Sequence, residues 1–298
     1  GGDNVSEEIK RMRSEGEMYD LILNFARAEK RVRGVILNGS RANPNAPKDK
    51  YQDFDIVFIV RDFDWFLAHQ SFLDYFGERR MMQTPEAMRD PDGSGHFNWL
   101  ILFLDGNRLD LTLIPIEKPE LIGRDSQSVV LMDKDNFLPQ FPPASDRDYY
   151  VKRPSELYYF SCCNDFWWCL QNVAKGIARD EMPYAMEMYD CVVRADLKDM
   201  ADWYIGVQND FGVSAGKMGK YYKRLLPPDV YNKYMSTYSD ARSESLWNAI
   251  FAACGLFGEL AREVGRFLGY NYIEQDEANM LAYLKEIRKE CEDAEFQL

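Results

Sequence analysis

The segment VILNGSRANPNAPKDKYQDFDIVFIV, residues 35–60, decides the fold class of this chain. It begins and ends with apolar runs whose length and composition are typical of buried β-strands. A Gly-Ser-Arg turn at residues 39–41 closes the first run, and Asp53 and Asp55 lead into the second. Because successive strand side chains point to opposite faces, the two aspartates should project side by side from one face.

Two carboxylates held side by side need a counter-charge. At about 4 Å their repulsion costs on the order of 4 kcal/mol at an effective dielectric constant near 20. Magnesium offsets such a cost, since it is usually bound by one or two carboxylates together with substrate phosphates. Glycine in the turn lets a phosphate approach the backbone amides. The Gly-Ser turn or the aspartate pair alone is often an ordinary surface feature, but their order and spacing favour a site for magnesium and a nucleotide. The predicted metal ligands are Asp53 and Asp55, and the predicted phosphate contacts are Gly39, Ser40 and Arg41.

Secondary-structure patterns divide the chain into an α/β part and a helical part. The first part has helical patterns at 6–30 and 64–76 and strand patterns at 32–38, 53–60, 78–82, 97–103 and 108–115. A proline-rich connection follows near residue 140, and then long helical patterns at 155–176, 183–209, 243–269 and 274–291. We predict the α+β class, with a mixed β-sheet and flanking helices in residues 1–143 and a helical bundle in residues 144–298.

Asp110 is the candidate for a third carboxylate. It lies near the start of the run LDLTLI, residues 109–114, on the face opposite the leucines. An acid in this position is about as often an ordinary surface residue as a functional one. If its strand lies beside that of Asp53 and Asp55, three carboxylates converge and could bind two divalent ions. Asp110 is the best-placed general base, although the sequence leaves open which acid accepts the proton.

The helical part offers weaker candidates. Lys175 and Arg179 share one helical face and could contact phosphates, but a solvated basic face explains them equally well. Asp165 lies in a dense aromatic segment that should be mostly core. Asp165 and Trp168 could nevertheless form an anionic and apolar wall for a cationic sugar. The same alternatives, acidic binding surface or solvated helix face, apply to Asp196, Asp199 and Asp202.

Composition limits the classes of partner. The formal net charge is −13 over 298 residues, which argues against a nucleic-acid binding surface and suits a small cationic substrate.

No apolar run approaches the length of a membrane span, and the six cysteines are scattered without a C-x-x-C pair, so we expect a cytoplasmic protein with reduced thiols. With only His69 and His96, a histidine-rich metal centre is not expected, and each histidine is interpreted as an ordinary surface or hydrogen-bonded residue. The oligomeric state cannot be derived from the sequence.

The order Gly-Ser, Asp-x-Asp and a later third acid resembles the nucleotidyltransferase superfamily typified by DNA polymerase β. Longer strings extend the likeness over nearly the whole chain and resemble the aminoglycoside 6-adenylyltransferases, also called streptomycin adenylyltransferases. These strings are LNGSRANPNAPKDKYQDFDIVFIV, FGERRMMQTPE, LDLTLIP, LMDKDN and CCNDFWWCLQNVAKGIARDE. The short motif identifies the superfamily, whereas the longer strings identify the subfamily.

The resemblance implies an enzyme that uses ATP and Mg²⁺, two ions being expected, to transfer AMP to the 6-hydroxyl of streptomycin with release of pyrophosphate. By motif it implies metal and catalytic roles for Asp53, Asp55 and Asp110, and a phosphate-binding role for Lys175. Asn38 departs from the acid expected before Gly-Ser in that family. Two alternatives are a nucleotidyltransferase with another hydroxylated acceptor and a noncatalytic nucleotide-binding protein of the same fold.

Overall fold

In the computed structural model, which describes residues 11–295, the chain divides into two compact units between Asp148 and Tyr149. The boundary expected from the sequence lay after residue 143. The first unit carries a mixed β-sheet and the second is helical, so the predicted α+β class is confirmed. Among the described residues, no helix is both long enough and apolar enough to span a membrane. All six cysteines are free thiols, as the sequence indicated.

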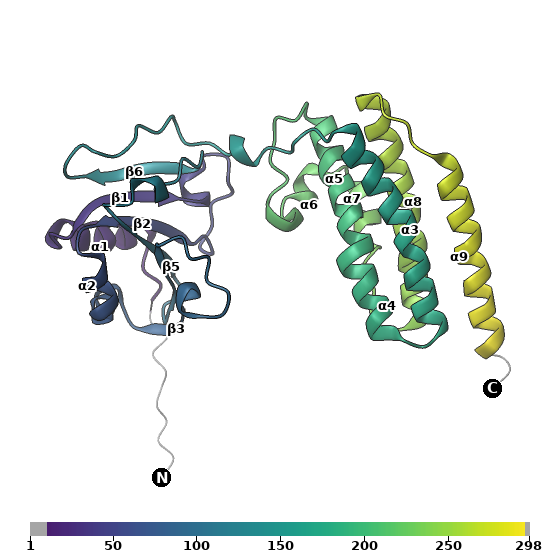
Figure 1. Cartoon of the computed structure of the whole chain (residues 1–298), viewed down its shortest axis with the longest axis horizontal. Coiled ribbons are helices and arrows are strands. Elements are labelled where there is room, and N and C mark those ends of the chain that lie inside the picture. Colours follow the sequence, from purple (N-terminus) through teal and green to yellow (C-terminus); the bar gives the residue numbers. More distant parts are fainter. Residues whose placement is uncertain (1–10, 296–298) are drawn as a thin grey trace, which may run out of the picture. The chain divides into compact units, whose positions relative to one another are not determined.

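A six-stranded sheet organises the described part of the first unit (Figure 1). Its order is β3 (Arg79–Gln83), β4 (Phe97–Phe103), β5 (Arg108–Pro115), β2 (Phe54–Val60), β1 (Val32–Asn38) and β6 (Ser128–Asp133). β2 and β5 run parallel, and the other neighbours are antiparallel. The turn at Asp105-Gly106-Asn107 joins β4 to β5 as a hairpin, with Gly106 at φ 89°.

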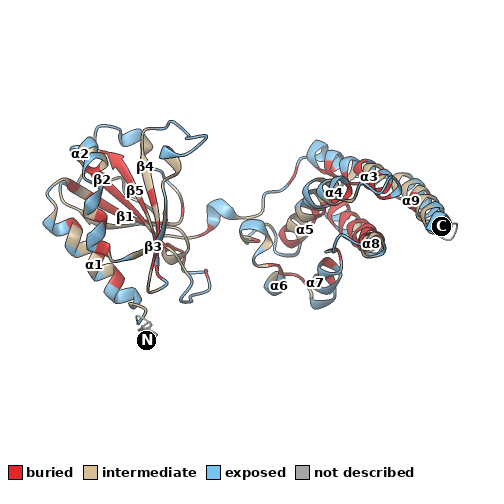
Figure 2. Ribbon diagram, turned by 90° about the horizontal axis from the view of Figure 1, so that it is seen from below, coloured by how far each residue is buried: buried red, intermediate tan, exposed pale blue. Residues whose placement is uncertain are grey.

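Helices cover one face of this sheet. Helix α1 (Glu15–Ala28) and helix α2 (Phe63–Ala68) pack on the large apolar core formed by alternate strand residues such as Phe58 and Leu111. Figure 2 shows these strands as the buried centre of the unit. The opposite face has a smaller apolar cluster around Ile59 and Ile114 and leaves the ends of β2 and β5 for polar side chains. The candidate site lies on this second face.

Three sequence expectations for the first unit need correction. The first helix begins at Glu15, because Ser14 caps it in a capping box with Glu17; residues 6–10 of the predicted helix lie outside the described residues. The predicted helix 64–76 is two pieces, α2 and the 3₁₀ segment Gln70–Phe76, because the backbone leaves the helical region at His69. Strand β6 was not predicted.

The second unit is a bundle of helices. Its elements are α3 (Glu156–Ala178), α4 (Met182–Met188), α5 (Arg194–Gln208), α6 (Tyr222–Leu225), α7 (Pro228–Met235), α8 (Ser243–Leu268) and α9 (Glu274–Glu295). A π-helical segment, Tyr189–Val193, joins α4 to α5, so the predicted helix 183–209 is continuous but not uniformly α. α3 packs against α4, α5 and α9, and α5 also packs against α8 (Figure 1). Buried aromatic rings such as Phe166 and Phe257, stacked at 3.9 Å between centroids, fill the core.

Candidate active site

A row of polar residues crosses one face of the sheet. Asp55 of β2 is in register with Asp110 of β5 on one side and with Asn38 of β1 on the other. Asn38 is in turn in register with Ser128 of β6. Cross-strand partners share a face. The pairing of β2 with β5 therefore brings Asp55 and Asp110 together, which the sequence could state only as a condition.

Asp53, two residues before Asp55, joins the same group. The Arg108 guanidinium links the first and third acids: Nη1 lies 3.5 Å from Asp53 Oδ2, and Nε lies 2.8 Å from Asp110 Oδ1. Arg108 Nη2 also donates to Asp110 Oδ2 at 2.8 Å, so the Asp110 contact is bidentate. Three carboxylates thus converge around one cationic side chain.

Asp55 is the acid most affected by its surroundings. Burial raises its pKa to about 7, and the negative charges of Asp110 and Asp53 add to this effect, while the positive charge of Arg108 opposes it. Such a shift means that the negative charge on Asp55 is poorly compensated by protein groups. A hard divalent cation that prefers carboxylate oxygens fits this donor set, because it would supply the missing positive charge. Asp53, Asp55 and Asp110 are the residues that would hold it.

Gly39 lies directly against the Asp55 carboxylate. Its φ is 75°, in the left-handed region, and a Cβ added there would overlap Asp55 Oδ2. Glycine is therefore required both by the backbone conformation and by the close approach of the turn. The Gly-Ser turn and the acid pair, separated in sequence, are adjacent in the fold.

The other two residues of the turn have different surroundings. Ser40 begins a short 3₁₀ turn, Ser40–Ala42, and its Oγ accepts a hydrogen bond from Gln52 Nε2 at 3.2 Å. Arg41 is nearly buried: it forms an ion pair with Glu15 at 2.6 Å and lies over the Phe54 ring at 3.8 Å. The Arg41 side chain is thus held by structural contacts, and its role toward phosphate stays a prediction.

Asn38, the departure from the expected acid, is held in place by β6. Ser128 Oγ donates a hydrogen bond of 2.8 Å to Asn38 Oδ1. An amide beside Asp55 adds no further negative charge to a site that already holds three carboxylates. The asparagine is therefore compatible with the acid group, since a fourth carboxylate there would increase the repulsion.

A second acidic region lies in the helical unit. An open groove of about 410 Å³ lies between α3 and α5, lined by carboxylates and aromatic rings: Tyr158, Phe160, Asp165, Asp196, Asp199 and Trp203. Burial, followed by the charge of Asp165 and a hydrogen bond with it, raises the pKa of Asp196 to about 8. Asp196 Oδ2 is buried and has no hydrogen-bond partner in the described structure. Within the described residues, the groove therefore carries a carboxyl group without a counter-cation.

The remaining predicted residues of α3 differ in position. Asp165 lines the groove and accepts a hydrogen bond from Cys169 Sγ at 3.4 Å. Trp168 is 63% exposed and is not part of the groove lining. Lys175 is exposed, with Nζ 3.5 Å from Gln171 Oε1. None of these positions tests the functional roles, which stay predictions.

Arg108 was not predicted as a site residue. Its signal was present, because Arg108 precedes Asp110 by two residues on one strand and must share its face. Asp196 was considered only as part of a solvated or acidic helix face, since its burial depends on the packing of α5 against α3.

Comparisons with known proteins show which family this chain resembles. Residues 12–287 match the family model for streptomycin adenylyltransferase. An aminoglycoside 6-adenylyltransferase of Bacillus subtilis is 40% identical over 270 residues, covering 89% of this chain and 95% of the relative. A protein of the same name from Campylobacter jejuni is 40% identical over 268 residues, 89% of this chain and 93% of its own. The crystal structure of an aminoglycoside 6-adenyltransferase from Bacillus subtilis superposes with a TM-score of 0.46 at 36% identity, covering 93% of this chain and 99% of that one.

Proposed function

This chain belongs to the streptomycin adenylyltransferase family, and from that membership we propose that it transfers AMP from ATP to a hydroxyl of an aminoglycoside. The proposed acceptor is streptomycin, modified at its 6-hydroxyl, and such modification would give resistance to the antibiotic. The observation that carries the proposal is the convergence of Asp53, Asp55 and Asp110 beside the Gly39 turn.

In the proposed reaction the acceptor oxygen forms a bond to the α-phosphorus of ATP. The bond from that phosphorus to the bridging oxygen breaks, pyrophosphate leaves with the electron pair, and a carboxylate takes the hydroxyl proton. Mg²⁺ held by the three aspartates would neutralise charge on the phosphates. Gly39 lets the turn lie against the Asp55 carboxylate, where a Cβ would overlap Oδ2, and in the proposal the backbone of this turn contacts the triphosphate.

Asp110 is the proposed general base, and its contact with Arg108 bears on this role. Both Asp110 oxygens accept hydrogen bonds from the guanidinium, at 2.8 Å each. The guanidinium thus occupies both oxygens of the carboxylate. In the proposal Arg108 releases Asp110 when ATP binds and turns to a phosphate, whose oxygens match the planar guanidinium fork.

For the acceptor, we propose that the acidic groove of the helical unit binds a positively charged group of the antibiotic. Asp165 and Asp196 supply the carboxyl groups, and Asp196 Oδ2 has no hydrogen-bond partner in the described structure. The pKa of Asp196 is raised to about 8, and a bound cation would favour its ionised form. The rings of Tyr158 and Trp203 supply flat apolar surface against a sugar or guanidinium face. Trp168 and Lys175, from the same helix α3, remain proposed contacts for substrate and phosphate.

The direct test is incubation of the full chain with ATP, Mg²⁺ and streptomycin. We expect pyrophosphate release and a product heavier by one AMP, with fragmentation locating the adduct at the 6-hydroxyl. A panel of other aminoglycosides and of GTP, CTP and UTP defines the acceptor and the nucleotide. Pyrophosphate release with another acceptor but not with streptomycin would overturn the substrate, and no release with any acceptor would overturn the activity.

A further inference from the structure

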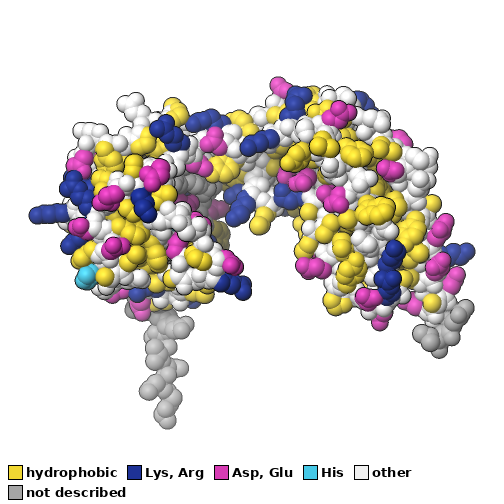
Figure 3. All heavy atoms as spheres, viewed as in Figure 1, with side chains coloured by type: hydrophobic (Ala, Val, Ile, Leu, Met, Phe, Trp, Pro, Cys, Tyr) yellow, Lys and Arg dark blue, Asp and Glu magenta, His cyan; other side chains and the backbone are white. Residues whose placement is uncertain are grey.

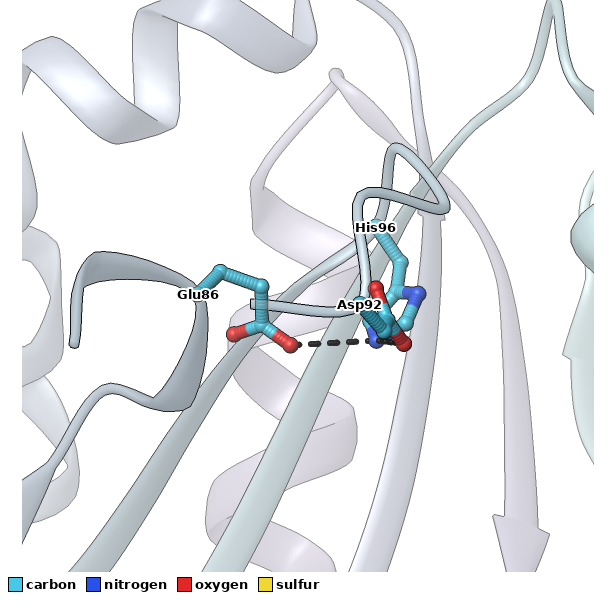
Figure 4. A group of neighbouring side chains, drawn as sticks. All are labelled: Glu86, Asp92 and His96. Atoms are coloured by element: carbon cyan, nitrogen blue, oxygen red, sulfur yellow. Dashed lines mark ion pairs between the residues drawn. The ribbon is translucent and has the colours of Figure 1, made fainter. Parts of the chain in front are cut away.

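A separate group of metal-ligating side chains lies between β3 and β4. Figure 4 shows Glu86, Asp92 and His96 turned toward one another. One ligand atom from each lies within 4.8 Å of the others. His96 Nε2 is 3.1 Å from Glu86 Oε1 and 3.5 Å from Asp92 Oδ2. One imidazole nitrogen and two carboxylate oxygens therefore share a small volume.

We propose that Glu86, Asp92 and His96 bind one divalent transition-metal ion, for which Zn²⁺ is the probe of choice. Zinc accepts nitrogen and carboxylate ligands at about 2.0–2.2 Å, and sites with three protein ligands keep an open position for water. Tetrahedral ligands at that distance are about 3.4 Å apart, so the present atoms, which lie within 4.8 Å of one another, need to close by at most about 1.4 Å. This site is independent of the proposed adenylyl transfer.

Hydrogen bonds orient each of the ligands. The Asn98 backbone N–H donates to Glu86 Oε2 at 2.8 Å, and Asn98 Nδ2 donates to Glu86 Oε1 at 2.6 Å. The Ser94 N–H donates to Asp92 Oδ1 at 2.9 Å, and Ser94 Oγ is hydrogen-bonded to His96 Nδ1. When Nδ1–H is the donor in that bond, Nε2 presents its lone pair to the two carboxylates. Outer contacts of this kind hold metal ligands in productive orientations.

The charge of the group also favours a divalent cation. Within residues 11–295, His96 is the ion-pair partner of both Glu86 and Asp92, and the Lys118 ammonium lies beside Gly95 without an ion pair to either. An imidazolium would offset one of the two negative charges, whereas a divalent ion offsets both. Glu86 and His96 side chains are only 13% and 19% exposed, so solvent screens this imbalance incompletely.

The group is tied to the sheet through Asn98. Thr112 Oγ1 donates to Asn98 Oδ1, and Thr112 lies two residues after Asp110 on the same face of β5. A bound ion would therefore fasten the loop that contains Gly93 and Gly95, both with positive φ, to this face of the sheet. The expected effect is a more ordered loop in the metal-loaded protein.

The experiment uses the two histidines of the chain, His69 and His96. In an Asp55→Asn background, which removes competition from the three-aspartate site, equilibrium dialysis should show one bound Zn²⁺ that His96→Gln abolishes. His69→Gln is the matched control and should retain it, because His69 is hydrogen-bonded to Trp65 O elsewhere. Ser94→Ala should weaken binding by about 10- to 100-fold through loss of the outer contact. In NMR spectra, Co²⁺ should broaden the His96 ring signals and leave those of His69 unchanged.

Equal Zn²⁺ uptake with and without His96→Gln would overturn the proposal. So would titration of His96 with no response to Zn²⁺ or Co²⁺, which would identify the group as an ion pair only. A difference in Zn²⁺ uptake between Asp55→Asn and Asp55→Asn/His96→Gln tests only the proposed metal site in the loop between β3 and β4. Loss of adenylyl transfer in Asp55→Asn concerns the proposed function alone, so the two failures are distinguishable.

Discussion

Two regions of this protein gather aspartates, but in the described structure one of them contains its own cation and the other does not. On the sheet, Asp53, Asp55 and Asp110 surround Arg108, which contacts two of them. In the helical groove, Asp196 lies with Asp165 and has a buried oxygen without a hydrogen-bond partner among the described residues. Figure 3 shows acidic and basic side chains interspersed on the visible surface.

The presence or absence of an internal cation indicates how each region depends on a ligand. Strand register fixes the sheet carboxylates within the first unit, and Arg108 reduces the repulsion between them. In the proposed function a cation would take over this role when ATP binds. The described part of the groove has no such internal substitute, so protonation of Asp196 relieves its repulsion instead. We therefore expect the sheet site to depend on metal and the groove to depend on pH and on a cationic ligand.

The largest effect should come from Asp55→Asn. Removal of this proposed metal ligand at the centre of the site should lower kcat for the proposed adenylyl transfer by about 10³-fold or more, in the range seen when a charge-stabilising group is lost. Pyrophosphate release measures it, and circular dichroism checks the fold. The exposed Asp20→Asn, on α1 of the same unit, is the control and should keep full activity. Near-normal turnover of the Asp55 variant would remove this acid from the mechanism.

Gly39→Ala should have the next largest effect, about 10²-fold in kcat/KM. The added Cβ would overlap the Asp55 carboxylate and displace it or the turn. Gly106→Ala is a matched control, because its φ is also positive but nothing lies within 4 Å of a Cβ added there. Both variants carry the strain of a positive φ, roughly 1–2 kcal/mol. If the two variants lose equal activity, close approach to Asp55 is not the reason for the glycine.

Asp196→Asn tests the groove of the helical unit. The neutral amide should raise KM for streptomycin by about 10-fold with a smaller change in kcat, as expected for loss of a charged hydrogen bond to the substrate. KM for ATP should stay unchanged. Asp293→Asn, exposed on α9, is the control variant. A change in KM for ATP alone would place Asp196 outside the acceptor site.

Arg108→Gln should have a smaller and opposite effect on the sheet site. Without the guanidinium, no protein cation competes with Mg²⁺ for Asp53 and Asp110. The affinity for Mg²⁺ in the absence of ATP should therefore rise by roughly 3-fold. Isothermal titration calorimetry of the two proteins measures this change. A weaker affinity in the variant would show that Arg108 organises the carboxylates more than it competes with a metal ion.

The last prediction concerns the pH dependence of stability due to Asp196. Its pKa is raised from 3.8 to about 8 in the folded chain, so the folded state binds the proton more tightly than the unfolded state. This contribution to stability is complete below about pH 4 and is lost as the pH rises toward 8. The Tm of Asp196→Asn should therefore fall less than that of the wild type between pH 5 and pH 8.5. Parallel Tm profiles for the two proteins would contradict the shifted pKa.

Local patterns predicted much of the fold. Residues 32–38 and 53–60 cluster apolar side chains strongly enough to predict β1 and β2, and the helical pattern at 6–30 predicted α1 but not its start at Glu15. Strand β6 was missed because its apolar run is short, residues 129–132, and these side chains are half-buried or exposed rather than buried. The break at His69 was missed because the helical pattern continues on both sides of it.

The sequence by itself determined which residues could form the site: a Gly-Ser turn, an Asp-x-Asp pair that one strand face could present, and a third acid on a later strand. It did so because turn chemistry and strand alternation act over a few neighbouring residues. Only the packed fold shows that Asp55 lies in register with Asp110, that Gly39 lies against Asp55, that Arg108 links two acids, and that Oδ2 of the half-buried Asp196 is shielded from solvent. These contacts join segments far apart in the chain, and their geometry and pKa shifts arise from strand pairing and helix packing, which no local pattern encodes.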